Sequence, residues 1–133
     1  MNVRSIDNAE LATTPAEYRK LVESDADWIV RSADDVWEVR EAGYGPLAKL
    51  PEVDLRAFVA TLEFKDGGVV TGSYRPLVAT LTLTDIFEVF GYFGWSRELF
   101  LRDLEYSCNL SSGSCQFDFW YFCSPEFCSP PGP

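Results

Sequence analysis

The stretch LEYSCNLSSGSCQFDFWYF, residues 104–122, decides the fold class more than any other part of the chain. Two runs of strand-forming residues flank the polar loop NLSSGS (109–114), and this pattern predicts a β hairpin. The second run is apolar on nearly both faces of the strand, with one face formed by Phe117, Phe119 and Tyr121 and the other by Asp118, Trp120 and Phe122. Such a strand is usually covered on both sides. We therefore expect residues 117–122 to be sheltered by this chain's helices or by another molecule.

Helices are predicted both at the start of the chain and just before this hairpin. The segment TPAE (14–17) contains a capping threonine and a proline suited to a first helical turn, so it predicts a helix that ends near Ser24. From residue 84 the apolar side chains follow the helical period, and a second helix begins at Ser96. The link between them is short, so we expect a helical hairpin at about 85–106.

Two further strand pairs are expected upstream. Residues 56–64, RAFVATLEF, alternate apolar and polar side chains and predict a strand, which the turn at 65–68 connects to an antiparallel strand over 69–74. Residues 27–41 predict two short strands, with a helix over 34–41 as the alternative. These elements predict an α+β fold, in which a small antiparallel sheet of two or three hairpins packs against an N-terminal helix and the helical hairpin.

The length of 133 residues and the hydrophobic share of 47% fit one globular unit. We expect a loose N-terminal lead-in over 1–13, a single α+β domain over 14–122 and a Cys/Pro-rich tail over 123–133. No segment approaches the roughly 18 apolar residues of a membrane span. The first 14 residues lack the apolar run of a secretory signal. These features predict a cytoplasmic protein that does not associate with a membrane.

The net charge of −10 indicates the kind of partner that the protein would bind. An acidic surface repels phosphate backbones, so we expect no direct nucleic-acid binding and instead a partner protein with a basic surface. Residues 23–54 hold nine acids and three bases. Aromatic side chains ringed by charge are good anchors at interfaces. We expect an acidic face here to bind the partner through Asp25, Asp27, Trp28, Asp34, Asp35 and Trp37.

The lack of histidine excludes several classes of site. Without it there is no Ser–His or Cys–His nucleophile pair and no imidazole metal ligand. No glycine-rich phosphate loop follows a predicted strand. We therefore expect no catalytic residue and no resident cofactor. The sequence favours a non-enzymatic protein-binding domain of the inhibitor or adaptor type, a class that includes phage-encoded inhibitors.

All four cysteines lie in the last 26 residues, at Cys108, Cys115, Cys123 and Cys128. Their spacing lacks the two close pairs of most structural zinc sites, although a folded hairpin would allow four thiolates to bind one zinc ion. Two disulfides are another alternative, Cys108–Cys115 across the hairpin and Cys123–Cys128 around the SPEF turn. Small buried thiols are the favoured interpretation for Cys108 and Cys115, whereas we expect Cys128 near the surface.

Two further hypotheses concern the C-terminal region. Residues 108–133 fit the substrate of modifying enzymes, so the chain would be the precursor of a ribosomally made peptide and its folded body a recognition handle. The aromatic C-terminal strand also favours a homodimer, because aromatic strands near a sheet edge pair readily.

Overall fold

Short polar caps begin four of the six α-helices in the computed structural model, which describes residues 1–129. In each case a hydroxyl oxygen accepts a backbone N–H from the first helical turn: Thr14 for α1 (Pro15–Glu23), Ser32 for α2 (Ala33–Glu41), Thr82 for α5 (Leu83–Gly91) and Ser96 for α6 (Arg97–Arg102). The other helices are α3 (Glu52–Thr61) and α4 (Arg75–Val78). Two 3-10 turns, η1 (Asn8–Glu10) and η2 (Pro46–Lys49), complete the helical elements of the described residues.

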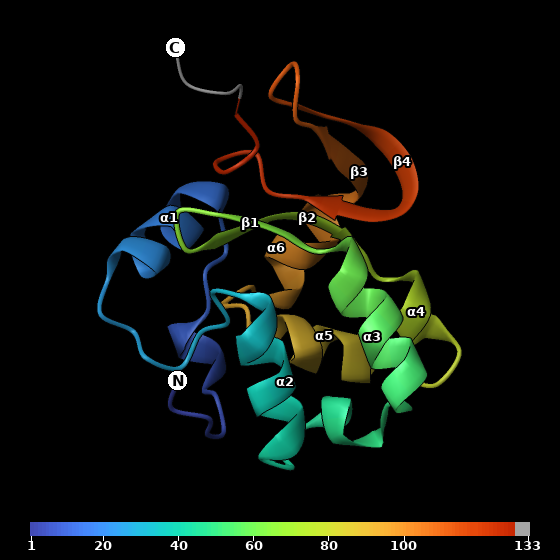
Figure 1. Ribbon diagram of the computed structural model, residues 1–133. Helices are drawn as coiled ribbons and strands as arrows, with labels where there is room; N and C mark the ends of the chain where they lie inside the picture. Colours follow the sequence, from blue (N-terminus) through green and yellow to red (C-terminus); the bar gives the residue numbers. More distant parts are fainter. Residues whose placement is uncertain (130–133) are drawn as a thin grey trace.

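The four strands form one antiparallel sheet in the order β1-β2-β4-β3. Their bounds are Glu63–Lys65, Gly68–Ser73, Leu104–Asn109 and Ser114–Cys123. A tight turn joins β1 to β2, with positive φ angles of 53° at Asp66 and 83° at Gly67. Figure 1 shows the helices gathered on one side of β1 and β2, with the β3–β4 hairpin rising away from them.

Aromatic side chains fill the space between the sheet and the helices. Phe90 of α5 stacks on Phe100 of α6 with 4.2 Å between ring centroids, and it meets the edge of Phe122 of β4 at 4.8 Å. Tyr18 of α1 is fully buried, and its hydroxyl oxygen accepts the backbone N–H of Val69 at 2.8 Å. Burial raises the pKa of Tyr18 to about 12, because the phenolate would lose its water. The first helix and the last strand therefore share one core.

The predicted α+β class, the helical pair and the C-terminal hairpin are confirmed. The strand predicted at 56–64 is wrong, because most of this segment lies in α3. Its buried side chains Leu55 and Phe58 are three residues apart and continue to Leu62, which is the helical period, whereas Ala60 is exposed. The strands predicted within 27–41 are also wrong, because residues 33–41 form α2 and the preceding residues form no strand.

Both ends of the described chain pack on the body. The backbone of Ala12 pairs with that of Trp95, and the Asn2 N–H donates to the Asp27 carbonyl at 2.7 Å, so the expected lead-in over 1–13 lies against the helices. Phe127 is buried, and its ring meets that of Tyr18 at 5.3 Å. The expected tail therefore contributes core residues up to Cys128, and its last four residues, 130–133, lie outside the described residues.

Candidate functional site

Strand β4 consists of two halves that pair with different neighbours. The first half, 114–117, pairs with β3, and the last three residues, 121–123, pair with β2. Between them the register shifts, because Tyr106 lies opposite Phe117 while Leu104 lies opposite Phe122. β4 thus uses five residues where β3 uses two. The extra residues form a large bulge that separates the projecting hairpin from the body of the sheet.

The bulge is built on two residues in a left-handed backbone conformation, with φ angles of 71° at Trp120 and 68° at Glu105. The Glu105 carboxylate binds both sides of the bend. Its Oε2 accepts the Trp120 N–H at 3.0 Å, and its Oε1 accepts the Tyr74 hydroxyl. Burial, together with the Glu105 carboxylate, raises the pKa of the Tyr74 hydroxyl well above its usual range. The bend is therefore held by β3, β4 and the residue that follows β2.

Two disulfides hold this region: Cys115–Cys123 joins the two halves of β4, and Cys108–Cys128 joins β3 to the end of the described chain. Neither of the pairs considered from sequence is formed, although Cys108 and Cys115 do lie opposite each other in the hairpin. The predicted exposure of Cys128 is wrong, because its side chain is buried and bonded. Within residues 1–129 no cysteine is free. The disulfides tie the hairpin both to the Ser124–Phe127 turn and to the sheet.

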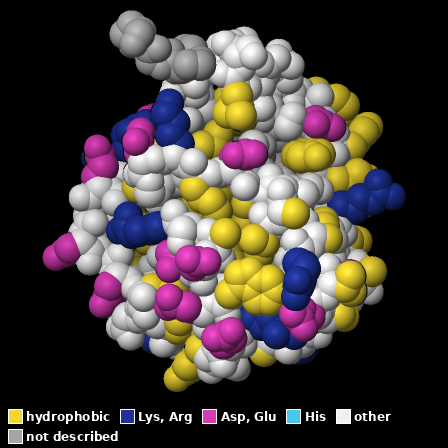
Figure 2. All heavy atoms as spheres, viewed as in Figure 1, with side chains coloured by type: hydrophobic (Ala, Val, Ile, Leu, Met, Phe, Trp, Pro, Cys, Tyr) yellow, Lys and Arg dark blue, Asp and Glu magenta, His cyan; other side chains and the backbone are white. Residues whose placement is uncertain are grey.

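The hairpin presents an aromatic surface to solvent, made of Tyr106, Phe117, Phe119 and Trp120. Phe117 and Phe119 are each 64% exposed, and the other two are about 40% exposed. Three of the rings are neighbours, with 4.7 Å between the centroids of Phe117 and Phe119 and 6.3 Å between those of Phe117 and Tyr106. Figure 2 shows hydrophobic atoms along the edge where β4 lies.

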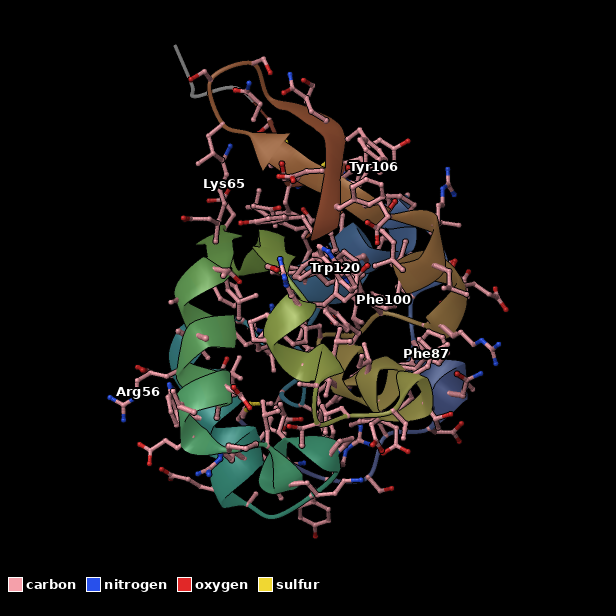
Figure 3. All side chains as sticks on the ribbon, turned by 90° about the vertical axis from the view of Figure 1, so that its right-hand side faces the viewer. Arg56, Lys65, Phe87, Phe100, Tyr106 and Trp120 are labelled. Carbon is pink, nitrogen blue, oxygen red and sulfur yellow. A yellow bond between two sulfur atoms is a disulfide. The ribbon has the colours of Figure 1, made fainter. Side chains whose placement is uncertain are left out.

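Of the two kinds of shelter expected for residues 117–122, this chain's own residues supply only part, and cover by another molecule stays a prediction. Phe122 is fully buried, but Phe117 and Phe119 are mostly exposed. Trp120 is partly covered, with 5.7 Å between its ring centroid and that of Tyr74 and with Arg75 lying over its face. In Figure 3 Tyr106 lies above Trp120, with Phe100 and Phe87 below them, so aromatic rings run from the hairpin toward α5.

The acidic residues expected to bind a partner lie in two places. Asp25 and Asp27 are exposed in the loop between α1 and α2, while Asp34 and Asp35 lie in the first turn of α2. Asp35 has a structural contact, because its Oδ2 accepts the Arg31 N–H at 2.8 Å. On the face shown in Figure 2, acidic side chains are scattered with basic ones between them.

The two tryptophans predicted as anchors are largely covered. Trp28 is only 5% exposed, and Arg4 lies 5.5 Å from its ring centroid. Trp37 is partly buried, with Arg56 at 5.9 Å. The most exposed aromatic side chains among the described residues are instead Phe117 and Phe119 of the β3–β4 hairpin. The aromatic pattern of residues 117–120 could have indicated this surface. It did not do so because an apolar strand of this kind is expected to be covered.

A small cleft lies beside the Cys115–Cys123 disulfide. It has a volume of about 210 Å³ and is lined by Arg102, Asp103, Tyr106, Cys115, Cys123 and Pro125. Asp103 is buried, and its Oδ2 has no hydrogen-bond partner among the described residues. Burial raises the pKa of this carboxyl to about 6, although the nearby Arg102 opposes the shift. Sequence reasoning missed Asp103, because nothing in its local pattern indicates burial.

A larger cleft of about 490 Å³ lies between the N-terminal segment and α5. Its wall includes Phe87, Glu88, Tyr92 and Arg97, with Arg97 lying over the Phe87 ring at 4.9 Å. Burial raises the pKa of the Tyr92 hydroxyl, and Glu88 adds to the shift. The cleft thus has one cation and one carboxylate, and its lining contains no cysteine.

Comparisons of this chain with models of protein families, with curated proteins and with solved structures found no match. Among residues 1–129, each helix falls short of the length and apolar character that crossing a bilayer requires.

Proposed function

We propose that this protein is a non-enzymatic protein-binding domain, of the inhibitor or adaptor type, that binds its partner through the aromatic surface of the β3–β4 hairpin. The observation that carries the proposal is the 64% exposure of both Phe117 and Phe119 on a hairpin fixed by two disulfides. Exposed apolar patches on a folded protein commonly mark interaction sites. Aromatic residues dominate the binding energy of many interfaces.

The rigidity of the hairpin supports this role. A segment that is already ordered loses little conformational entropy on binding. Cys115 joins the two halves of β4, and Glu105 binds across the bend, so the aromatic rings are presented by a constrained backbone. A flexible loop with the same side chains would bind more weakly, because it would have to be ordered first.

The charge of the protein favours a partner with an apolar pocket and a rim of lysine or arginine. A net charge of −10 attracts such a surface and repels a second copy of the chain. Asp25, Asp27 and Asp34 are exposed and contribute to this negative charge. A homodimer through the aromatic C-terminal strand, β4, is the competing occupant. The precursor hypothesis stays a prediction, which the intact mass of the protein from its native host tests.

The proposal is tested by comparing matched surface variants. Tagged wild-type protein captures the partner, which is identified and purified, and Kd is then measured for each variant. The double variant Phe117→Ser/Phe119→Ser removes the centre of the aromatic surface, and we expect at least about thirtyfold weaker binding. Val53→Ser is the control, since Val53 of α3 is 72% exposed and lies outside this surface.

Charge reversal at Asp25 and Asp27 tests how much the acidic residues contribute to binding, because both lie in a loop outside α1 and α2. Asp35 is not changed, since its carboxylate accepts the backbone N–H of Arg31. We expect Asp25→Lys/Asp27→Lys to slow association mainly at low salt.

The proposal is overturned if the Phe117/Phe119 variant, shown to be folded by circular dichroism, binds as tightly as Val53→Ser. Dimerisation of the wild type that the same variant abolishes would assign the surface to a second copy instead.

A further inference from the structure

Three cysteine sulfurs cluster at the base of the hairpin, and the fourth is bonded to one of them. The Sγ atoms of Cys108, Cys123 and Cys128 all lie within 4.8 Å of one another. The fourth sulfur, that of Cys115, is bonded to Cys123 and so belongs to the same cluster. Segments that are separate in sequence, the hairpin and the Ser124–Phe127 turn, therefore bring four soft ligands together.

We propose that this cluster is a zinc site when the cysteines are reduced, with one Zn²⁺ bound by four thiolates. A tetrahedral tetrathiolate site has Zn–S bonds of about 2.3 Å, which places neighbouring sulfurs about 3.8 Å apart. The sulfurs of Cys108, Cys123 and Cys128 already lie within 4.8 Å of one another, and the Cys115 sulfur must move in from its bond to Cys123. The bonded pairs must separate by about 2 Å, a shift that rotation of the side chains supplies.

The backbone holds the ligands in place without the disulfides. Cys108 and Cys115 are opposite each other in the hairpin register, and the Cys108 N–H donates to Thr71 Oγ1 at 3.3 Å. Cys123 and Cys128 bracket a turn in which the Cys128 N–H donates to the Ser124 carbonyl at 2.8 Å. The two ligand pairs are thus each fixed by local hydrogen bonds.

The turn is also anchored to the body. Arg19 Nε donates to Glu126 Oε2 at 2.9 Å, and a second guanidinium nitrogen of Arg19 donates to the Glu126 carbonyl. Phe127 is buried and packs between Tyr18 and Arg19. After reduction, these contacts keep Cys123 and Cys128 next to the hairpin, so the entropy cost of assembling a metal site is small.

The access from solvent and the thiolate ligands also suit zinc. Cys123 and Cys128 are buried, while the cleft beside Cys115 and Cys123 gives the metal a path from solvent. Thiolate ligands alone select zinc over magnesium or calcium, which prefer oxygen.

The zinc form requires that both disulfides are first reduced. Two molecules of a dithiol reductant transfer four electrons and four protons to the two disulfides, giving four cysteine thiols and two reductant disulfides. The four thiols then release four protons as they bind Zn²⁺ as thiolates. The redox state of the compartment therefore determines which form is present. The disulfides form in an oxidising environment, and the zinc site forms in a reducing one. The inference does not depend on the partner of the hairpin.

Metal titration of the full chain tests the site. The protein is reduced without oxygen by a phosphine, which adds no competing thiol, and is titrated first with Co²⁺ and then with Zn²⁺. We expect one cobalt per chain with sulfur-to-cobalt charge-transfer bands, displacement of cobalt by one zinc, and one zinc per chain in native mass spectrometry. Cys115→Ser should weaken binding by at least about tenfold. The disulfide form, treated identically without reductant, should bind no zinc.

Loss of fold on reduction is followed in the same samples by circular dichroism. If reduction unfolds the chain and zinc restores the fold, the proposal is supported, since structural zinc sites couple binding to folding. It is overturned if the reduced chain binds no zinc, whether folded or unfolded. It is also overturned if cobalt shows only the weak spectrum of oxygen ligands, or if Cys115→Ser binds zinc as tightly as the wild type.

Discussion

Cys115 and Cys123 lie eight residues apart on one β-strand, yet only 5.9 Å separates their Cα atoms. A straight strand would place them about 27 Å apart. The difference is the bulge at Trp120, which turns the second half of β4 onto β2 and brings the two cysteines together. The same bend exposes Phe117 and Phe119, so the disulfide and the aromatic surface have one structural cause.

Removing the disulfides should destabilise the protein by amounts that follow their loop lengths. Cys115→Ser/Cys123→Ser opens a loop with a sequence separation of 8, and we expect the free energy of unfolding to fall by about 2–3 kcal/mol. Cys108→Ser/Cys128→Ser, with a separation of 20, should cost about 3 kcal/mol. Urea unfolding without reductant measures both values, and unchanged stability in both variants would contradict the assigned pairs.

Tyr18→Phe tests the link between α1 and the sheet. The variant removes a hydroxyl that accepts the buried Val69 N–H at 2.8 Å and leaves that donor without a partner. We expect the free energy of unfolding to fall by about 1–3 kcal/mol, since the ring itself still fills its place. Thermal unfolding of the two proteins at pH 7 gives the difference. Equal midpoints would mean that the hydrogen bond is not formed.

Gly68→Ala tests the packing of the Ser124–Phe127 turn on β2. A Cβ atom at Gly68 would lie 2.6 Å from the Phe127 ring, so the ring and the turn must move. We expect destabilisation of about 1–3 kcal/mol. Gly91→Ala is the matched control, because a Cβ there meets nothing closer than 3.9 Å.

Gly91 lies within α5, so its replacement should be neutral or should stabilise the helix by up to about 1 kcal/mol. If Gly68→Ala unfolds at the same denaturant concentration as Gly91→Ala, Phe127 does not pack on Gly68.

The raised pKa of the Asp103 carboxyl predicts that the stability of the disulfide form depends on pH. Burial raises its pKa from 3.8 to about 6 in the folded state, so the folded protein holds this proton more tightly than the unfolded chain. The free energy of unfolding should therefore fall as the pH rises from about 4 to above 6, by about 2–3 kcal/mol for this group. Asp103→Asn cannot ionise and should lack this loss.

Urea unfolding at pH 4.5 and at pH 8 measures the effect. Relative to the wild type, Asp103→Asn should be more stable at pH 8 and nearly equal at pH 4.5. A difference between the two proteins that is the same at both pH values would contradict the raised pKa.

Local signals account for the parts of the fold that the sequence predicts. Thr14 and Ser96 are caps whose hydrogen bonds lie within a single turn, and the NLSSGS loop separates two runs of strand-forming residues. The α3 segment was mistaken for a strand because Phe58 and Leu62 fit both a period of two and the helical period. The local pattern of this segment fits both a strand and a helix, and packing against the rest of the chain selects the helix.

The candidate site depends on contacts between distant residues. The bend at Trp120 is held by Glu105, which also binds Tyr74 across 31 positions of sequence. The disulfide pairs follow from this bend, since four cysteines allow three pairings and the sequence alone does not choose among them. The exposure of Phe117 could not be predicted either, because an apolar pattern does not say whether a neighbour covers it.

Mapping the disulfides tests the central claim, that the bend of β4 gathers the four cysteines at the base of an exposed aromatic hairpin. Chelator-treated protein is oxidised in air, digested at acidic pH and examined by mass spectrometry without reduction. The account predicts linked peptides that contain Cys115 with Cys123 and Cys108 with Cys128. Peptides that link Cys108 with Cys115 and Cys123 with Cys128 would contradict it, because β4 would then lack the bond that joins its two halves.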